Sequence, residues 1–316
     1  MVEADGKKLL YTGDIRFHGT NPMTIDDYVK KVGSGIDVMI CEGTRVDSDK
    51  TLTEADIIKA ISEKIKSVKG LVFVDFSWKD TTRYETMKKA ALAAGRIFVI
   101  NARLAYLLDK LGMYPSDEHV RVFLKRKGSC LYSPADYVLS KYEVGLSVDW
   151  ETDIDCRHYE NGIVAADIKK HPERYVMMLS YFDLNQIFDF ADNDGKIPDS
   201  WLIKAQCAPF CDEMELDEER LIHWLETFGI GFELDTSPIP EGCANPMCTK
   251  IKRRLKRDHV SGHISRNEIR ELIEKINPKT VFPVHTEDPK AFVKIVDDIG
   301  KGMEVILPEY GHCYEL

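Results

Sequence analysis

The segment from 70 to 111 alternates twice between a short apolar run and an amphipathic stretch. The runs at 70–76 and 96–100 are rich in Val, Ile and Phe and predict strands, whereas 82–94 and 102–111 carry apolar residues at helical spacing. Strands separated by helices of this length predict a parallel sheet with helices on both faces. Further strands are predicted at 8–12, 36–41, 175–180, 201–205, 230–234, 281–284 and 304–307, so we expect an α/β protein.

Composition limits the classes of function. A chain of 316 residues can hold one large or two ordinary domains. Its net charge of −10 argues against general nucleic-acid binding, so any polyanion would have to meet a local basic patch. Eight cysteines without a secretion signal favour reduced thiols and a cytoplasmic location. No window approaches the length of a membrane span, and no membrane partner is expected.

Two histidines near the C-terminus attract attention because of their surroundings. His263 lies in Ser-Gly-His, and His285 lies in Pro-Val-His-Thr-Glu. Between them the apolar residues recur at helical spacing, and Asn277-Pro278 predicts the end of that helix. We expect each histidine at the end of a strand, both at the same edge of a sheet.

Two carboxylates occupy comparable positions. Asp14 follows Tyr-Thr-Gly, and Glu42 follows Val-Met-Ile-Cys. Each of these four side chains would, alone, more often have an ordinary structural or solvated role. Together, two carboxylates and two imidazoles at strand ends suit a divalent metal such as zinc, whose catalytic sites keep one position open for water.

These motifs resemble the metallo-β-lactamase superfamily and its β-CASP branch, which contains RNA-processing and DNA-repair nucleases. Tyr11-Thr-Gly-Asp14 is similar to the fourth motif of the superfamily. Glu42, Ser261-Gly-His263 and Pro283-Val-His-Thr-Glu287 resemble the three additional motifs of the branch. The resemblance covers the whole chain in outline, and its motifs are specific in combination.

The resemblance implies a role for each of these residues. Asp14 would bridge two zinc ions, and His285 would ligate the second of them. Glu42 would hold a histidine in place, and His263 would face the scissile phosphate as a hydrogen-bond or proton donor. Hydroxide held by zinc would then hydrolyse a phosphodiester bond.

One departure from the family pattern is large. The family's main ligand cluster, His-x-His-x-Asp-His, has no counterpart here, and His18 is a common neighbour of the fourth motif rather than a substitute for it. We therefore expect a C-terminal portion with an incomplete zinc site of one or two ions. Such a chain would be inactive alone and would pair with an upstream metallo-β-lactamase half or with another copy of itself.

Several weaker signals accompany the motifs. The segment 247–257 is predicted to be a basic helix, and its Arg253 and Arg254 are candidate phosphate contacts, although an ordinary solvated helix explains them equally well. Ser261 and Ser265 could also bind phosphate, although an ordinary loop role is open for each. Cys207-x3-Cys211 and Cys243-x4-Cys248 could form a four-thiolate zinc site, but buried free thiols are the commoner outcome.

The sequence thus predicts a partial metallo-β-lactamase αββα sandwich with an inserted β-CASP-type parallel-sheet α/β domain. The expected segments are 1–60 and 199–316 for the sandwich and 61–198 for the insert. The expected function is a zinc-dependent ribonuclease, with RNA favoured over DNA. The alternatives are a non-catalytic β-CASP scaffold subunit of a nuclease assembly and a metal-dependent hydrolase of a small ester or thioester.

Overall fold

The computed structural model describes residues 1–19, 23–49, 52–115, 118–126, 154, 157–209, 211–236, 253–258 and 260–315. Its contacts divide the chain into two compact units, Met1–Glu54 with Val260–Leu316, and Ala55–His259. The predicted insert 61–198 lies inside the second unit. The range 199–259, which the sequence analysis grouped with the C-terminal segment, also belongs to the second unit.

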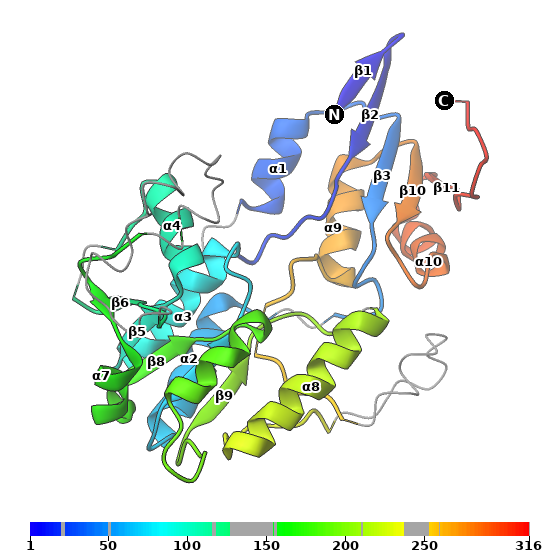
Figure 1. The fold of residues 1–316 in the computed structure, drawn as a ribbon. Helices are drawn as coiled ribbons and strands as arrows, with labels where there is room; N and C mark the ends of the chain where they lie inside the picture. The colour runs from blue at the N-terminus through cyan, green and yellow to red at the C-terminus, as the bar shows by residue number, and fades with distance from the viewer. Residues whose placement is uncertain are drawn as a thin grey trace, which may run out of the picture. The chain divides into compact units, whose positions relative to one another are not determined.

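The first unit is built on a five-stranded sheet in the order β1-β2-β3-β10-β11 (Figure 1). The strands are β1 (Val2–Ala4), β2 (Lys7–Tyr11), β3 (Val38–Glu42), β10 (Thr280–Val284) and β11 (Glu304–Val305). β1 pairs antiparallel with β2, and all other neighbours are parallel. The helices are α1 (Ile25–Val32), α9 (Arg266–Ile276) and α10 (Lys290–Ile299). Strands far apart in sequence, β3 and β10, are therefore direct neighbours.

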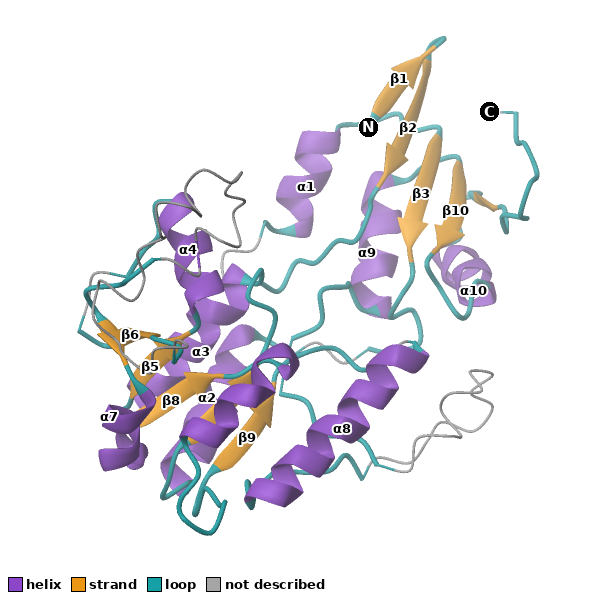
Figure 2. Cartoon of the chain, in the orientation of Figure 1, coloured by secondary structure: helices purple, strands orange, loops and turns teal. Residues whose placement is uncertain are grey.

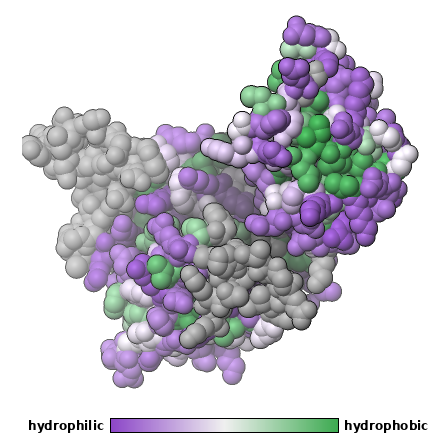
Figure 3. Space-filling model, turned by 90° about the vertical axis from the view of Figure 1, so that its right-hand side faces the viewer, coloured by the Kyte–Doolittle hydropathy of each residue, from purple (hydrophilic) through white to green (hydrophobic). Residues whose placement is uncertain are grey.

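Alternation along the strands gives this sheet two different faces. Leu10, Met39, Cys41 and Val281 belong to the buried core, together with the apolar stripe of α9 that the sequence predicts at Ile269, Leu272, Ile273 and Ile276. Strand neighbours one residue away point to the opposite face. That face includes Leu9, Tyr11 and Ile40, which lie outside the core, and Tyr11 is 51% exposed. Figure 3 shows apolar residues reaching the surface on one side of this unit.

The second unit contains a six-stranded parallel sheet in the order β7-β6-β5-β8-β4-β9 (Figure 2). Its strands are β4 (Val72–Asp75), β5 (Ile97–Ile100), β6 (Val120–Phe123), β7 (Gly162–Ile163), β8 (Tyr175–Met178) and β9 (Trp201–Lys204). Its helices are α2 (Glu54–Ser67), α3 (Thr81–Ala93), α4 (Ala102–Lys110), α7 (Ala165–Lys170) and α8 (Asp212–Phe228), with 3₁₀ segments at Pro172–Arg174 and Tyr181–Asp189. The predicted α/β class with parallel sheets is confirmed.

Three local predictions are wrong. The basic segment is extended over 253–258, where Leu255 and Arg257 form isolated β-bridges, because Leu255 is buried in the core while its neighbours point outward. No strand precedes His263 in the described residues, and 260–264 is a loop. The run at 230–234 forms isolated bridges rather than a strand.

Among the described residues, no helix combines the length and apolar character needed to cross a bilayer.

Burial along α8 offers a test of the packing in the second unit. Leu225 is fully buried and Leu216 is 54% exposed on the same helix. Leu225→Ala is expected to lower the free energy of unfolding of this unit by about 2–5 kcal/mol, because it leaves a cavity in the core. Leu216→Ala should change it by less than about 0.5 kcal/mol. All four tryptophans lie between 55 and 259, so urea unfolding followed by tryptophan fluorescence reports on this unit.

Candidate active site

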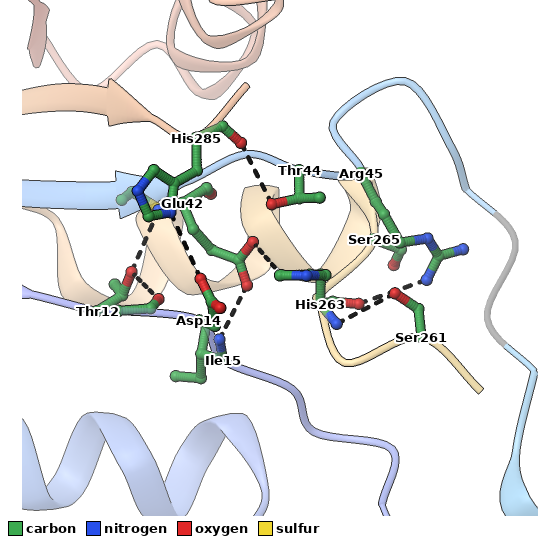
Figure 4. A network of polar contacts seen from close by, with 12 residues as sticks. Thr12, Asp14, Ile15, Glu42, Thr44, Arg45, Ser261, His263, Ser265 and His285 are labelled. Atoms are coloured by element: carbon green, nitrogen blue, oxygen red, sulfur yellow. Dashed lines mark hydrogen bonds and ion pairs between the residues drawn. The ribbon is translucent and has the colours of Figure 1, made fainter. Parts of the chain in front are cut away.

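The ends of three neighbouring parallel strands bring the predicted residues to one edge of the first unit's sheet. Glu42 is the last residue of β3, Asp14 follows β2 after a short turn, and His285 follows β10 directly. The register pairs Tyr11 with Ile40 and Glu42 with Val284, so the carboxyl ends of the strands coincide. Figure 4 shows the four predicted side chains, His263 included, gathered at this edge.

Glu42 and His263 form the tightest contact of the site. His263 Nδ1 lies 2.8 Å from Glu42 Oε2, and Glu42 Oε1 accepts a 2.8 Å hydrogen bond from the backbone N–H of Ile15. Glu42 is 1% exposed. A buried carboxylate needs such partners, since an unpaired charge in this position would be strongly destabilising.

This contact changes the acidity of both groups. Burial alone raises the pKa of Glu42, but the hydrogen bonds from His263 and from the Ile15 backbone outweigh it, and the pKa lies below its usual value. The hydrogen bond to Glu42 raises the pKa of His263, against the opposing effect of partial burial. The pair is therefore held as carboxylate and imidazolium over a wider pH range than the isolated groups.

Asp14 and His285 form a second, exposed contact. His285 Nδ1 lies 3.5 Å from Asp14 Oδ1, and both side chains are 61% exposed. His285 has a φ of +50°, a left-handed conformation that is uncommon for residues other than glycine. Its carbonyl accepts a 3.2 Å hydrogen bond from the Thr44 hydroxyl, which helps to hold this turn.

One group of possible metal ligands includes three of the four residues. Single ligand atoms of Asp14, Glu42 and His263 all lie within 4.8 Å of one another. His285 joins the site through Asp14 rather than through this group. Carboxylate oxygens and imidazole nitrogens are zinc ligands, so the donor types at this edge fit the predicted metal. Glu42 and His263 are already bonded to each other, which leaves the exposed pair Asp14 and His285 as the predicted ligands.

The two predicted serines have different surroundings. Ser261 is partly buried, and its Oγ accepts a 3.2 Å hydrogen bond from the His263 backbone N–H. Ser265 is fully buried as the N-cap of α9, in a capping box with Glu268. Its hydroxyl donates to Glu268 Oε2 at 2.9 Å, so the geometry does not favour Ser265 as a phosphate contact.

The predicted basic contacts belong to the second unit. Arg253 pairs with Glu226 of α8, and Arg254 is partly buried in the same extended segment. Lys256 pairs with Glu233, and Arg257 with Glu218. Acidic neighbours thus account for much of this basic run. Of the cysteine pairs, Cys207 and Cys211 are exposed free thiols, and Cys243 and Cys248 lie outside the described residues.

Sequence reasoning missed three supporting groups. The Ile15 backbone N–H holds Glu42, the Arg45 guanidinium lies 3.4 Å from the His263 carbonyl oxygen, and the Thr12 hydroxyl accepts from the Glu42 backbone N–H at 3.2 Å. Arg45 follows Glu42 by three residues, which is the only sequence signal that could have indicated it. A backbone donor such as that of Ile15 leaves no signal in a sequence.

Glu42→Gln tests the coupling between these groups. The substitution removes the carboxylate that favours the imidazolium, so the pKa of His263 is expected to fall, as followed by NMR titration of its ring protons. The stabilisation from the raised His263 pKa is present at low pH and is lost as pH rises through the folded value; that from Glu42 is lost as pH falls through its lowered value. Glu274→Gln, on the exposed face of α9, is the matched control and should leave His263 unchanged.

Part of the sequence matches a known protein family. Residues 250–307 match the sequence family described as the Zn-dependent metallo-hydrolase RNA specificity domain. This region contains His263 and His285, whereas Asp14 and Glu42 lie before it. No curated protein sequence matches the chain.

A similar solved structure is the crystal structure of a protein of unknown function from Enterococcus faecalis V583. It has 18% sequence identity and a TM-score of 0.59, and the similarity covers 96% of this chain and 57% of that chain. At this identity the likeness concerns the fold alone. The chain spans 57% of that protein's length. The family match is confined to residues 250–307.

Proposed function

We propose that the first unit carries part of the active site of a zinc-dependent ribonuclease of the β-CASP type. The observation that supports this most is the contact between Glu42 and His263, at the strand edge that also presents Asp14 and His285. A histidine with a raised pKa beside two further ligand-type side chains is the pattern expected of acid–base chemistry next to a metal. The matched RNA specificity domain contains both histidines.

In this proposal Asp14 and His285 hold zinc. Both side chains are exposed and carry donor atoms that zinc accepts. A catalytic zinc site ordinarily has three protein ligands and one open position, so two ligands are too few. We propose that another polypeptide segment supplies the others and that this chain alone is inactive. Bound zinc would supply hydroxide at neutral pH by lowering the pKa of water to about 7.

His263 is proposed to face the scissile phosphate. Glu42 holds its Nδ1, so Nε2 is the nitrogen that can be directed toward a substrate. The raised pKa favours the protonated ring, which is the form that can donate to a phosphate oxygen or to the leaving oxygen. Glu42 then acts as a positioning residue, because its carboxylate is buried and bonded to His263 and Ile15.

RNA is proposed as the substrate because the matched domain is described by its RNA specificity. Ser261 lies next to the His263 loop and is the better serine candidate for a phosphate contact, since Ser265 is buried. Arg253 and Arg254 remain candidates in the second unit, where Glu226 already neutralises Arg253. We also propose that the second unit, which contains 61–198, is a β-CASP-type insert and that the first unit forms half of an αββα sandwich.

The partner is proposed to be an upstream metallo-β-lactamase half. The sheet face that carries Tyr11 and Ile40 lies outside the unit's core, and a second sheet packed on it would complete a sandwich. Pairing of two copies is the alternative. A scaffold subunit, a DNA nuclease and a small-ester hydrolase are also alternatives, and the well-formed Glu42–His263 contact favours an enzyme over a scaffold.

Complementation tests the proposal. The chain is purified alone and after co-expression with a polypeptide that carries a His-x-His-x-Asp-His cluster encoded beside it. Only the co-expressed form is expected to contain about two zinc ions and to cleave labelled single-stranded RNA. His285→Ala should lower cleavage by about a hundredfold or more and reduce the metal content, because it removes a ligand.

His223→Ala is the matched control, since His223 is an exposed histidine on α8. It should leave the metal content and the cleavage rate unchanged. A co-expressed complex that assembles but contains no zinc and leaves RNA intact would exclude the enzyme and favour the scaffold. Faster cleavage of single-stranded DNA than of RNA would reassign the substrate.

A further inference from the structure

His18 is a buried histidine that the proposed chemistry does not use. It lies in the segment after β2, four residues beyond Asp14, and is 8% exposed. Its two ring nitrogens face oxygen atoms of two different segments. Nδ1 lies 3.2 Å from Glu268 Oε1, and Nε2 lies 3.0 Å from the carbonyl oxygen of Ser261.

Both of these oxygens are hydrogen-bond acceptors. A backbone carbonyl has no proton to donate. The Glu268 carboxylate accepts through its other oxygen from the backbone N–H of Ser265 at 2.8 Å and from the Ser265 hydroxyl at 2.9 Å. Burial raises the pKa of Glu268, but the hydrogen bonds from His18 and Ser265 outweigh it and lower the pKa, which keeps the group ionised.

A neutral imidazole has one N–H and can satisfy only one of these acceptors. The other nitrogen would then place a lone pair against an oxygen lone pair in a buried site, which costs free energy. Only the imidazolium form donates to both Glu268 and Ser261. The two acceptors therefore favour the form of His18 that has an N–H on each ring nitrogen.

The two acceptors belong to the structure around His263. Ser261 starts the loop that carries His263, and its Oγ accepts from the His263 backbone N–H. Glu268 lies in the first turn of α9, immediately after that loop. His18 thus connects the segment that carries Asp14 to both ends of the loop that carries His263.

We propose that His18, as an imidazolium, is a positioning residue that fixes the 261–263 loop against the first turn of α9. It thereby sets the place of His263 relative to Asp14. This role of His18 rests on the proposed function, because it treats His263 as part of an active site. The connection itself is a property of the folded chain and needs neither metal nor RNA.

The charge state is tested by NMR on the chain with ¹⁵N-labelled histidine at pH 7. Wild-type His18 is expected to carry protons on both ring nitrogens. In Glu268→Gln the side-chain amide can donate to Nδ1, so His18 should become neutral with its proton on Nε2, while glutamine preserves the capping box. A neutral His18 ring in the wild-type chain would overturn the proposal.

The connection to the loop is tested by amide hydrogen exchange. His18→Phe retains an aromatic ring but removes both donors, and the His263 amide is expected to exchange about tenfold faster or more, with the amides in the middle of α9 unchanged. His312→Phe is the control, because His312 is an exposed histidine of the same unit. Unchanged exchange at His263 in a folded His18→Phe chain would overturn the proposal. If this variant does not fold, the Glu268→Gln measurement decides.

A kinetic test applies to the complemented form if it cleaves RNA. His18→Phe is then expected to lower kcat by about tenfold to a hundredfold with little change in KM, because it displaces His263 rather than a binding contact. A change confined to KM would contradict a positioning role. The histidine NMR and the amide hydrogen exchange need no nuclease activity, so the two proposals can fail separately.

Discussion

The buried carboxylate of Glu42 is the constraint on which the candidate site depends. It is almost fully enclosed at the end of β3, and a charge in that position must be compensated by hydrogen bonds from elsewhere in the chain. The donors come from Ile15, after β2, and from His263, before α9. Three segments that are distant in sequence must therefore converge at one point for the unit to fold without an uncompensated charge.

The parallel arrangement of β2, β3 and β10 explains why possible catalytic side chains gather at the same place. Carboxyl ends of parallel strands meet at one edge, where the loops are free to carry polar side chains. Asp14 and His285 are exposed there, in contrast to Glu42. His285 has a left-handed backbone conformation. Gly43 packs against Phe292 so closely that an added Cβ would lie 2.4 Å from the Phe292 ring. The local backbone is adapted to place these groups.

Charges in the second unit are arranged differently. Its basic residues Arg253, Lys256 and Arg257 pair with glutamates of the same unit, and the buried Lys204 pairs with Asp75. Pairing of this kind lowers the attraction that a basic segment would exert on a polyanion. The acidic balance of the whole chain agrees with this arrangement, so a recognition of RNA would depend on local groups such as the His263 loop.

Local pattern was sufficient for most of the elements. Apolar runs and helical spacing identified the strands β3, β4, β5 and β10 and the helices α3, α4 and α9, because burial on a regular element imposes its period on the sequence. The motifs also identified Asp14, Glu42, His263 and His285 as candidates. The pattern failed for the segment 253–258, where the period of the charges suggested a helix and the burial of Leu255 imposed an extended chain.

The sequence alone thus determined which residues were candidates and which class of fold could carry them. Only the tertiary structure decided how they are connected: that Glu42 holds His263, and that His18 bridges Glu268 and Ser261. The reason is that these contacts join residues far apart in the sequence. His18 and Ser261 are 243 positions apart, and Glu42 and His263 are 221 positions apart. Local propensity carries no record of such pairings, which arise only when parallel strands from both ends of the chain form one sheet.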